Sequence, residues 1–110
     1  MKVEISQSKT ITIDGVDGLD PVVVFLQHFG ESRYRVTVEC YGQAWSAFFG
    51  NIGRGSIERF IADCGGSADY LVNALINGAR QHMLTKRIAP QEAYLTKIVT
   101  AIKAALKDAE

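Results

Sequence analysis

The chain has 110 residues, of which 47% are hydrophobic and 22% are charged, and twelve basic residues balance twelve acidic ones. This length and balance are typical of one folded domain and exclude a disordered chain. The neutral total argues against a mimic of DNA, which needs a strong negative excess. It argues equally against a protein that coats DNA without sequence preference, which needs a positive one. We therefore expect a single domain over residues 1–110.

The opening segment predicts β-structure. Its apolar residues Val3, Ile5, Ile11 and Ile13 all occupy odd positions, and the polar residues Thr10, Thr12 and Asp14 alternate with the last two. Such alternation indicates a half-buried strand or a hairpin of two strands.

Three more strands follow the turn signals of residues 14–21. Residues 22–26 are apolar on both faces, as in a central strand. Residues 33–40 alternate between apolar and polar positions, and residues 44–49 are rich in aromatics. Because the connections are short, we expect a four- or five-stranded antiparallel meander within a sheet half, residues 1–53.

The second half, residues 56–110, predicts about three helices. Ser56 suits an N-cap, and apolar residues at helical spacing follow it. Leu71, Val72, Leu75 and Ile76 form the apolar face of a second helix, which Asn77-Gly78 would end. Pro90 suits the first turn of the last helix. The predicted fold class is therefore α+β, with the helices packed on one face of the sheet.

The residue inventory offers little for catalysis or metal binding. Cys40, Cys64, His28 and His82 carry no zinc-ligand spacing, and we expect two reduced thiols. The sequence has no P-loop and no nucleophile elbow. We therefore expect no metal, no cofactor and no catalytic residues, so that the protein is not an enzyme.

The segment from Gly50 to Ser56 connects the sheet half to the helical half, and it has two interpretations. Its backbone amides could face an anion, with Arg54 adding positive charge. It could instead be a tight crossover that needs the conformational freedom of glycine. The Walker lysine is missing and the predicted sheet is antiparallel, so the crossover is favoured.

Three aromatic residues crowd the fourth predicted strand. Trp45, Phe48 and Phe49 cannot all point to one face, because successive side chains of a strand alternate. At least one must leave the core face, where another element covers it or a partner binds it.

Positive charge gathers toward the end of the chain. Between Arg80 and Lys107 there are six basic residues and one acid, Glu92. One interpretation is a basic strip that binds nucleic acid or the acidic surface of a partner protein. The other is a solvated helix face. The candidate partner-binding residues are Trp45, Arg54, Arg80, Lys86, Arg87 and Lys97.

We expect no contact with a membrane. The longest strongly apolar run, residues 22–26, is far shorter than the ~20 residues that a spanning helix needs. Glu4 interrupts the segment in which a signal peptide would build its apolar stretch. These features, together with reduced cysteines, predict a cytoplasmic protein.

Several segments carry a family resemblance. Residues 14–21, 36–45 and 49–53 resemble small proteins encoded in prophages of enteric bacteria, and residues 68–75 and 92–99 are similar to other parts of those proteins. Within the second segment, the Cys-Tyr-Gly-x-Ala-Trp run is the most specific. The resemblance implies a phage accessory protein that works in the cytoplasm of the bacterial host, and it implies no catalytic residues.

Two functional hypotheses follow. In the first, the protein binds and inhibits a host protein complex, for example a defence complex such as a CRISPR effector. In the second, it is a nucleic-acid-binding accessory module that uses the basic last third of the chain. The apolar face of the last helix could also pair with a second subunit, so a homodimer is a further hypothesis.

Overall fold

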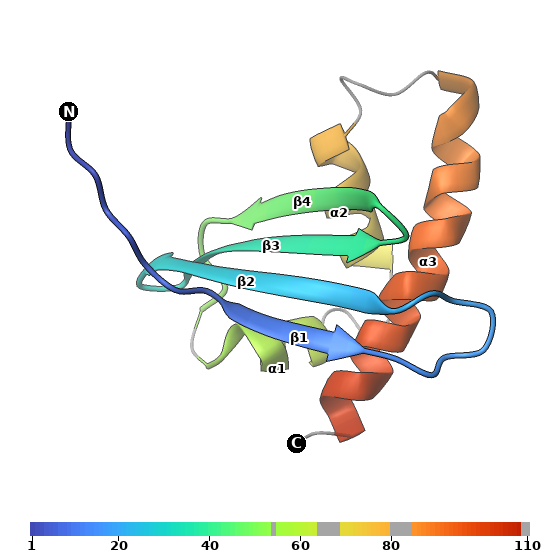
Figure 1. Ribbon diagram of the computed structural model, residues 1–110, viewed down its shortest axis with the longest axis horizontal. Coiled ribbons are helices and arrows are strands. Elements are labelled where there is room, and N and C mark those ends of the chain that lie inside the picture. Colours follow the sequence, from blue (N-terminus) through green and yellow to red (C-terminus); the bar gives the residue numbers. More distant parts are fainter. Residues whose placement is uncertain (54, 64–68, 80–84, 109–110) are drawn as a thin grey trace.

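The computed structural model describes residues 1–53, 55–63, 69–79 and 85–108, with only the backbone described for residues 79 and 85–87. These residues form four strands and then three helices (Figure 1), which confirms the predicted α+β class. The elements are β1 (Lys9–Ile13), β2 (Val22–Gly30), β3 (Arg33–Cys40), β4 (Gln43–Phe49), α1 (Ile57–Asp63), α2 (Asp69–Ala79) and α3 (Thr85–Asp108).

The strands form one antiparallel sheet in the order β1-β2-β3-β4, a meander as predicted. Its register places Val24 of β2 between Ile11 of β1 and Val38 of β3, and Val38 pairs in turn with Trp45 of β4. The opening segment supplies one strand rather than a hairpin. Residues 1–8 leave β1 and extend away from the sheet (Figure 1), and their side chains are exposed.

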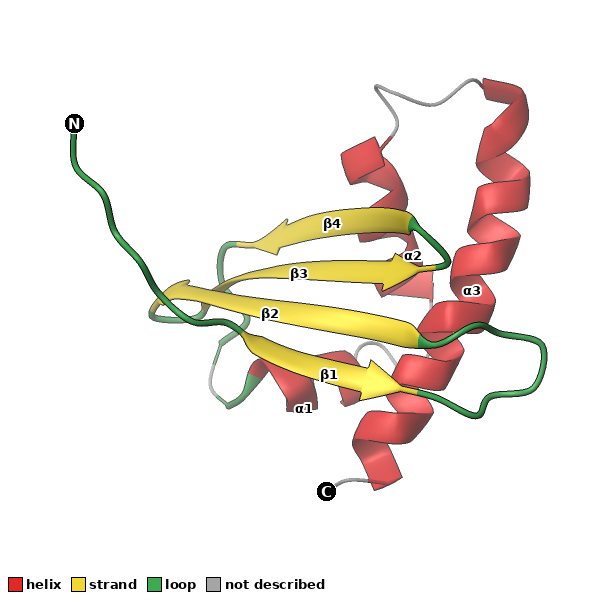
Figure 2. Cartoon of the chain, in the orientation of Figure 1, coloured by secondary structure: helices red, strands yellow, loops and turns green. Residues whose placement is uncertain are grey.

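All three helices lie on the same face of the sheet (Figure 2). Helix α2 packs against β4, α3 reaches β1, and both α1 and α2 contact α3. The core lies between these two layers because each strand directs every second side chain toward the helices. Its largest fully buried side chains come from both layers: Val22, Val24, Val36, Val38, Ile61, Leu71, Leu75, Ile76, Leu95, Ile98, Val99 and Ile102.

Helix α3 begins earlier than the sequence predicts. It starts at Thr85, so Pro90 lies inside the helix rather than in its first turn. A proline at that position removes one hydrogen bond from the helix ladder, because its nitrogen carries no proton. The apolar residues that follow it still form the predicted buried stripe, which shows that packing against the core outweighs the proline signal.

Gly78 has a different role from the predicted helix stop. It lies within α2, where a Cβ atom would overlap the main-chain carbonyl oxygen of Ser46 in β4. Only glycine lets the helix approach the strand this closely, since a backbone atom cannot move aside as a flexible side chain can.

We expect Gly78→Ala to lower the free energy of unfolding by about 1–3 kcal/mol, as overpacking in a core does. Helix propensity alone predicts the opposite sign, because alanine favours a helix by about 1 kcal/mol over glycine. Urea unfolding measures the difference. Gly50→Ala is the control, because a Cβ there meets only Phe48, at an ordinary 3.7 Å. A stabilised Gly78→Ala variant would contradict the close approach of α2 to β4.

Candidate binding surface

The sheet face that turns away from the helices is open (Figure 2). We call it the outer face. The strand register aligns its side chains in rows across the sheet, so that Phe25 of β2 lies between Thr10 of β1 and Thr37 of β3. The outer face consists of Thr10, Thr12, Val23, Phe25, Gln27, Phe29, Arg35, Thr37, Glu39, Ala44, Ser46 and Phe48.

Two phenylalanines and an arginine form a cluster at one end of the outer face. The rings of Phe29 and Phe48 lie 5.9 Å apart between centroids, and they remain 40% and 54% exposed. The Arg35 guanidinium carbon lies 5.2 Å from the centre of the Phe29 ring, within the range of a cation–π contact. Phenylalanine and arginine are both enriched at protein interfaces relative to the rest of the surface.

The backbone beneath this cluster is held by a second arginine. The β2–β3 register shifts between His28 and Gly30. There the Arg33 guanidinium donates a hydrogen bond of 3.1 Å to the Phe29 carbonyl oxygen. The Phe29 ring is therefore presented by a braced strand end rather than by a free loop.

The outer face has little net charge. Arg35 is offset by Glu39 four residues along the same strand, and the remaining members are apolar, hydroxyl or amide side chains. A surface that binds nucleic acid gains affinity mainly by neutralising phosphates, which requires several cations. The composition of the outer face fits a protein partner better.

The aromatic residues of β4 divide between the two faces, as their spacing requires. Phe48 belongs to the outer face, whereas Trp45 and Phe49 point into the core. Trp45 is only 4% exposed, and its indole Nε1 donates a hydrogen bond of 3.0 Å to Gln91 Oε1. Its ring meets Tyr94 edge-on, 5.8 Å between centroids. The structure therefore corrects the choice of Trp45 as a surface residue, and Phe48 is the exposed aromatic of this strand.

Two consecutive hydrogen bonds lie beside Trp45. The Tyr94 hydroxyl donates to Cys40 Sγ at 3.2 Å, and the Cys40 thiol, a buried free cysteine, donates to the Asp20 carbonyl oxygen at 3.6 Å. The bond to Cys40, together with removal from water, raises the pKa of Tyr94 to about 12. Tyr94 therefore stays neutral near pH 7 and joins α3, β3 and the β1–β2 loop as a structural contact.

Of the basic residues between Arg80 and Lys107, the structure describes the side chains of Lys97, Lys103 and Lys107. Lys97 is exposed on α3, beside a pocket of about 430 Å³ under the β1–β2 loop. Lys103, counted among the basic residues of this stretch, is buried, and its ammonium donates a hydrogen bond of 3.0 Å to the Ile61 carbonyl oxygen of α1. A cation suits this place because the end of a helix carries partial negative charge. The candidates that lie outside the described residues or side chains are Arg54, Arg80, Lys86 and Arg87.

The connection from β4 to α1 uses its own polar groups. The Ile52 amide donates to the Ser32 carbonyl oxygen, and the Gly53 amide to Asn51 Oδ1, both at 3.0 Å. Ser56 caps α1 as predicted, because its hydroxyl oxygen accepts from the Arg59 amide at 3.1 Å. These contacts favour the crossover interpretation, because the Ile52 and Gly53 amides, two of those that could face an anion, already have acceptors.

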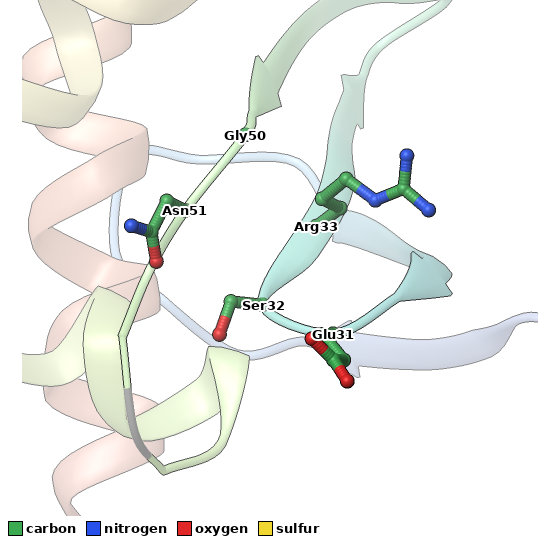
Figure 3. A pocket seen from close by; sticks show the side chains of 5 residues that line it. All are labelled: Glu31, Ser32, Arg33, Gly50 and Asn51. Atoms are coloured by element: carbon green, nitrogen blue, oxygen red, sulfur yellow. The ribbon is translucent and has the colours of Figure 1, made fainter.

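An open pocket of about 460 Å³ lies between this connection and the β2–β3 turn. Its lining residues are Glu31, Ser32, Arg33, Gly50 and Asn51 (Figure 3). Figure 3 shows the Arg33 side chain extending away from Ser32 and Asn51. The Ser32 hydroxyl donates to the Gly53 carbonyl oxygen at 2.7 Å, which ties the two loops together. The lining groups thus brace the loops and do not converge on a common point.

The described part of the chain contains neither a cluster of metal ligands nor a membrane-spanning helix. Among those residues, no three His, Cys, Asp or Glu side chains gather as a metal site would require. None of the described helices is long and apolar enough to cross a membrane.

Comparison with known families places the chain. The model of a phage protein family, Phage_phiTE_072, matches residues 1–88. The chain belongs to this phage family. The match confirms the predicted phage origin, and it spans the sheet, α1, α2 and the start of α3, so that the whole outer face lies inside it. No curated protein and no solved structure matches the chain.

Proposed function

We propose that this phage protein is a non-enzymatic accessory protein that binds a host protein through the outer face and blocks it by occupying one of its surfaces. The observation that carries the proposal is the open face with Phe29 and Phe48 exposed beside Arg35. Membership of a phage family supports a role during infection. A host defence complex, such as a CRISPR effector, is the class of target that we infer, since inhibition by occlusion needs only a shaped surface.

The size of the outer face is sufficient for such a role. Four strands of five to nine residues, about 4.8 Å apart and about 3.3 Å per residue, span roughly 20 by 25 Å. Side chains that project from this area add accessible surface. A stable interface needs about 800 Å² from each partner, so the outer face with its rim is of the right order.

A pull-down from host lysate tests the proposal. The tagged protein is incubated with lysate of infected or defence-competent bacteria, with and without nuclease, and bound proteins are identified by mass spectrometry. We expect a host protein in stoichiometric amount whose recovery survives nuclease. Recovery that collapses with nuclease would contradict the proposal, and it would favour nucleic-acid binding by the basic residues, Lys97 among them.

The stoichiometry of inhibition then tests occlusion against catalysis. Increasing amounts of the phage protein are added to the captured complex, and the activity of that complex is measured. Occlusion predicts activity that falls in proportion to the protein added and ends near one equivalent per binding site. Complete inactivation by a small fraction of an equivalent would show turnover and overturn the non-enzymatic role.

A further inference from the structure

Residues 1–8 form an extended arm that precedes β1 (Figure 1). Its side chains are exposed, including Val3 at 73% and Ile5 at 93%. Two β-branched residues in water are unusual in a segment that a folded domain could have packed, because each leaves apolar surface in contact with solvent. The composition of the arm therefore suits contact with an apolar partner surface, which the described part of the folded domain does not provide.

The arm continues the alternation of β1. Val3 and Ile5 share the odd positions of Ile11 and Ile13, and these two side chains point to the helix-covered face of the sheet. Because a strand repeats every two residues, an arm extended in line with β1 would turn Val3 and Ile5 to that same face. Among the described residues of one chain, no strand pairs with the arm, so its alternating pattern has no partner strand.

The outer edge of β1 also has no partner strand in the described part of the chain. β1 is the first strand of the sheet and has β2 as its one neighbour. The backbone groups on its free side can accept a strand from another molecule. The arm and this edge are contiguous, so a segment that pairs with both would be an extended chain about eleven residues long, the length of residues 3–13.

We propose that two copies of this chain pair through residues 3–13 as antiparallel strands related by a two-fold axis at Ser8. This register places Val3 opposite Ile13 of the second copy and Ile5 opposite Ile11, so that each apolar residue meets an apolar one. Gln7 then faces Lys9, whose ammonium stays paired with Glu58 at 2.7 Å on α1. The segment is its own complement, as a two-fold interface requires.

The neighbouring registers fit less well. A shift by one pair of residues in one direction sets Lys9 against Lys9 of the second copy, and like charges directly opposite each other are unfavourable. The shift in the other direction sets Ile5 against Lys9. A shift by a single residue would turn the apolar side chains of one copy to the wrong face.

The pairing joins two four-stranded sheets into one of eight strands. A two-fold axis perpendicular to the sheet keeps like faces on the same side, so the helices of both copies cover one face and both outer faces lie together on the other. Two binding surfaces on one platform would raise the avidity for a partner that presents repeated sites. The pairing itself does not depend on what the outer face binds.

A single cysteine at the proposed axis tests the register. In Ser8→Cys the two thiols would lie opposite each other, with Cα atoms about 4.5–5.5 Å apart, which suits a disulfide. Thr12→Cys is the control: it is exposed on the same strand but faces Glu4 of the second copy. Each variant is oxidised mildly and run on a non-reducing gel, with the wild type alongside because Cys40 is a free thiol.

We expect Ser8→Cys to form a covalent dimer at least about tenfold faster than Thr12→Cys. By light scattering, the unmodified protein should have twice the mass of one chain. The Ile5→Asp variant should have the mass of one chain, and its circular dichroism spectrum should match that of the wild type. Equal cross-linking of the two cysteine variants would overturn the proposal. So would a monomeric wild type at every concentration up to about 1 mM, which would assign the arm to a different partner.

Discussion

Trp45→Ala is expected to lower the free energy of unfolding by about 3–5 kcal/mol, the usual cost of removing a buried tryptophan side chain. Trp45 is 4% exposed, packs edge-on against Tyr94 and donates a hydrogen bond to Gln91. Its removal would leave a cavity between β4 and α3 as well as an unpaired amide oxygen. For a domain whose total stability is about 5–15 kcal/mol, this loss is a large fraction.

Urea unfolding followed by circular dichroism gives the difference in free energy. Tyr41→Ala is the matched control, because Tyr41 is an aromatic residue that is 79% exposed in the β3–β4 turn. The control should change stability by less than about 0.5 kcal/mol. Equal effects of the two substitutions would show that Trp45 is not part of the core. Trp45→Phe, which keeps most of the ring, should cost about 1 kcal/mol for the lost hydrogen bond.

The spacing of apolar residues and the positions of turn-forming residues were sufficient to predict the architecture. The alternation in β3 and the three- and four-residue spacing in α3 are strong signals, and the structure confirms the meander and the helix-covered face. The start of α3 could not be predicted in the same way. Pro90 is a strong local boundary signal, but burial of Leu95, Ile98 and Val99 along one stripe stabilises a helix that extends past it.

The candidate surface could be predicted only in part. Alternation in β4 requires an aromatic on the open face, yet the sequence does not say which face the helices cover, so Trp45 and Phe48 could not be told apart. Phe29 was missed because the apolar run that predicts this strand covers residues 22–26, whereas β2 continues to Gly30. Val23, Phe25 and Phe29 share the odd positions of that strand, and this spacing was the signal that could have found them.

The role of Lys103 depended on tertiary contacts. In the sequence it belongs to a basic stretch, and only the packing of α1 against α3 brings its ammonium to the Ile61 carbonyl oxygen. The role of Gly78 is similar, because the glycine before the end of a helix looks like a stop signal. Contacts between distant elements decide both positions, and no local pattern encodes them.

Phe48→Asp is expected to weaken binding of the host protein by about 30-fold or more, which corresponds to about 2 kcal/mol. Phe48 is 54% exposed at the aromatic cluster, and a carboxylate there would be desolvated in the complex without a designated partner. Because the side chain is largely exposed, we expect the variant to fold, with a stability loss of about 0.5–1 kcal/mol from the lost contact with Phe29.

The affinity of the captured host protein for three purified chains tests the outer face most directly. Calorimetric titration compares the wild type with Phe48→Asp and with Tyr41→Asp, which makes the same chemical change at an exposed aromatic outside the outer face. We predict a dissociation constant at least about 30-fold higher for Phe48→Asp, and one within about twofold of wild type for Tyr41→Asp. Wild-type affinity in a folded Phe48→Asp variant would contradict the account.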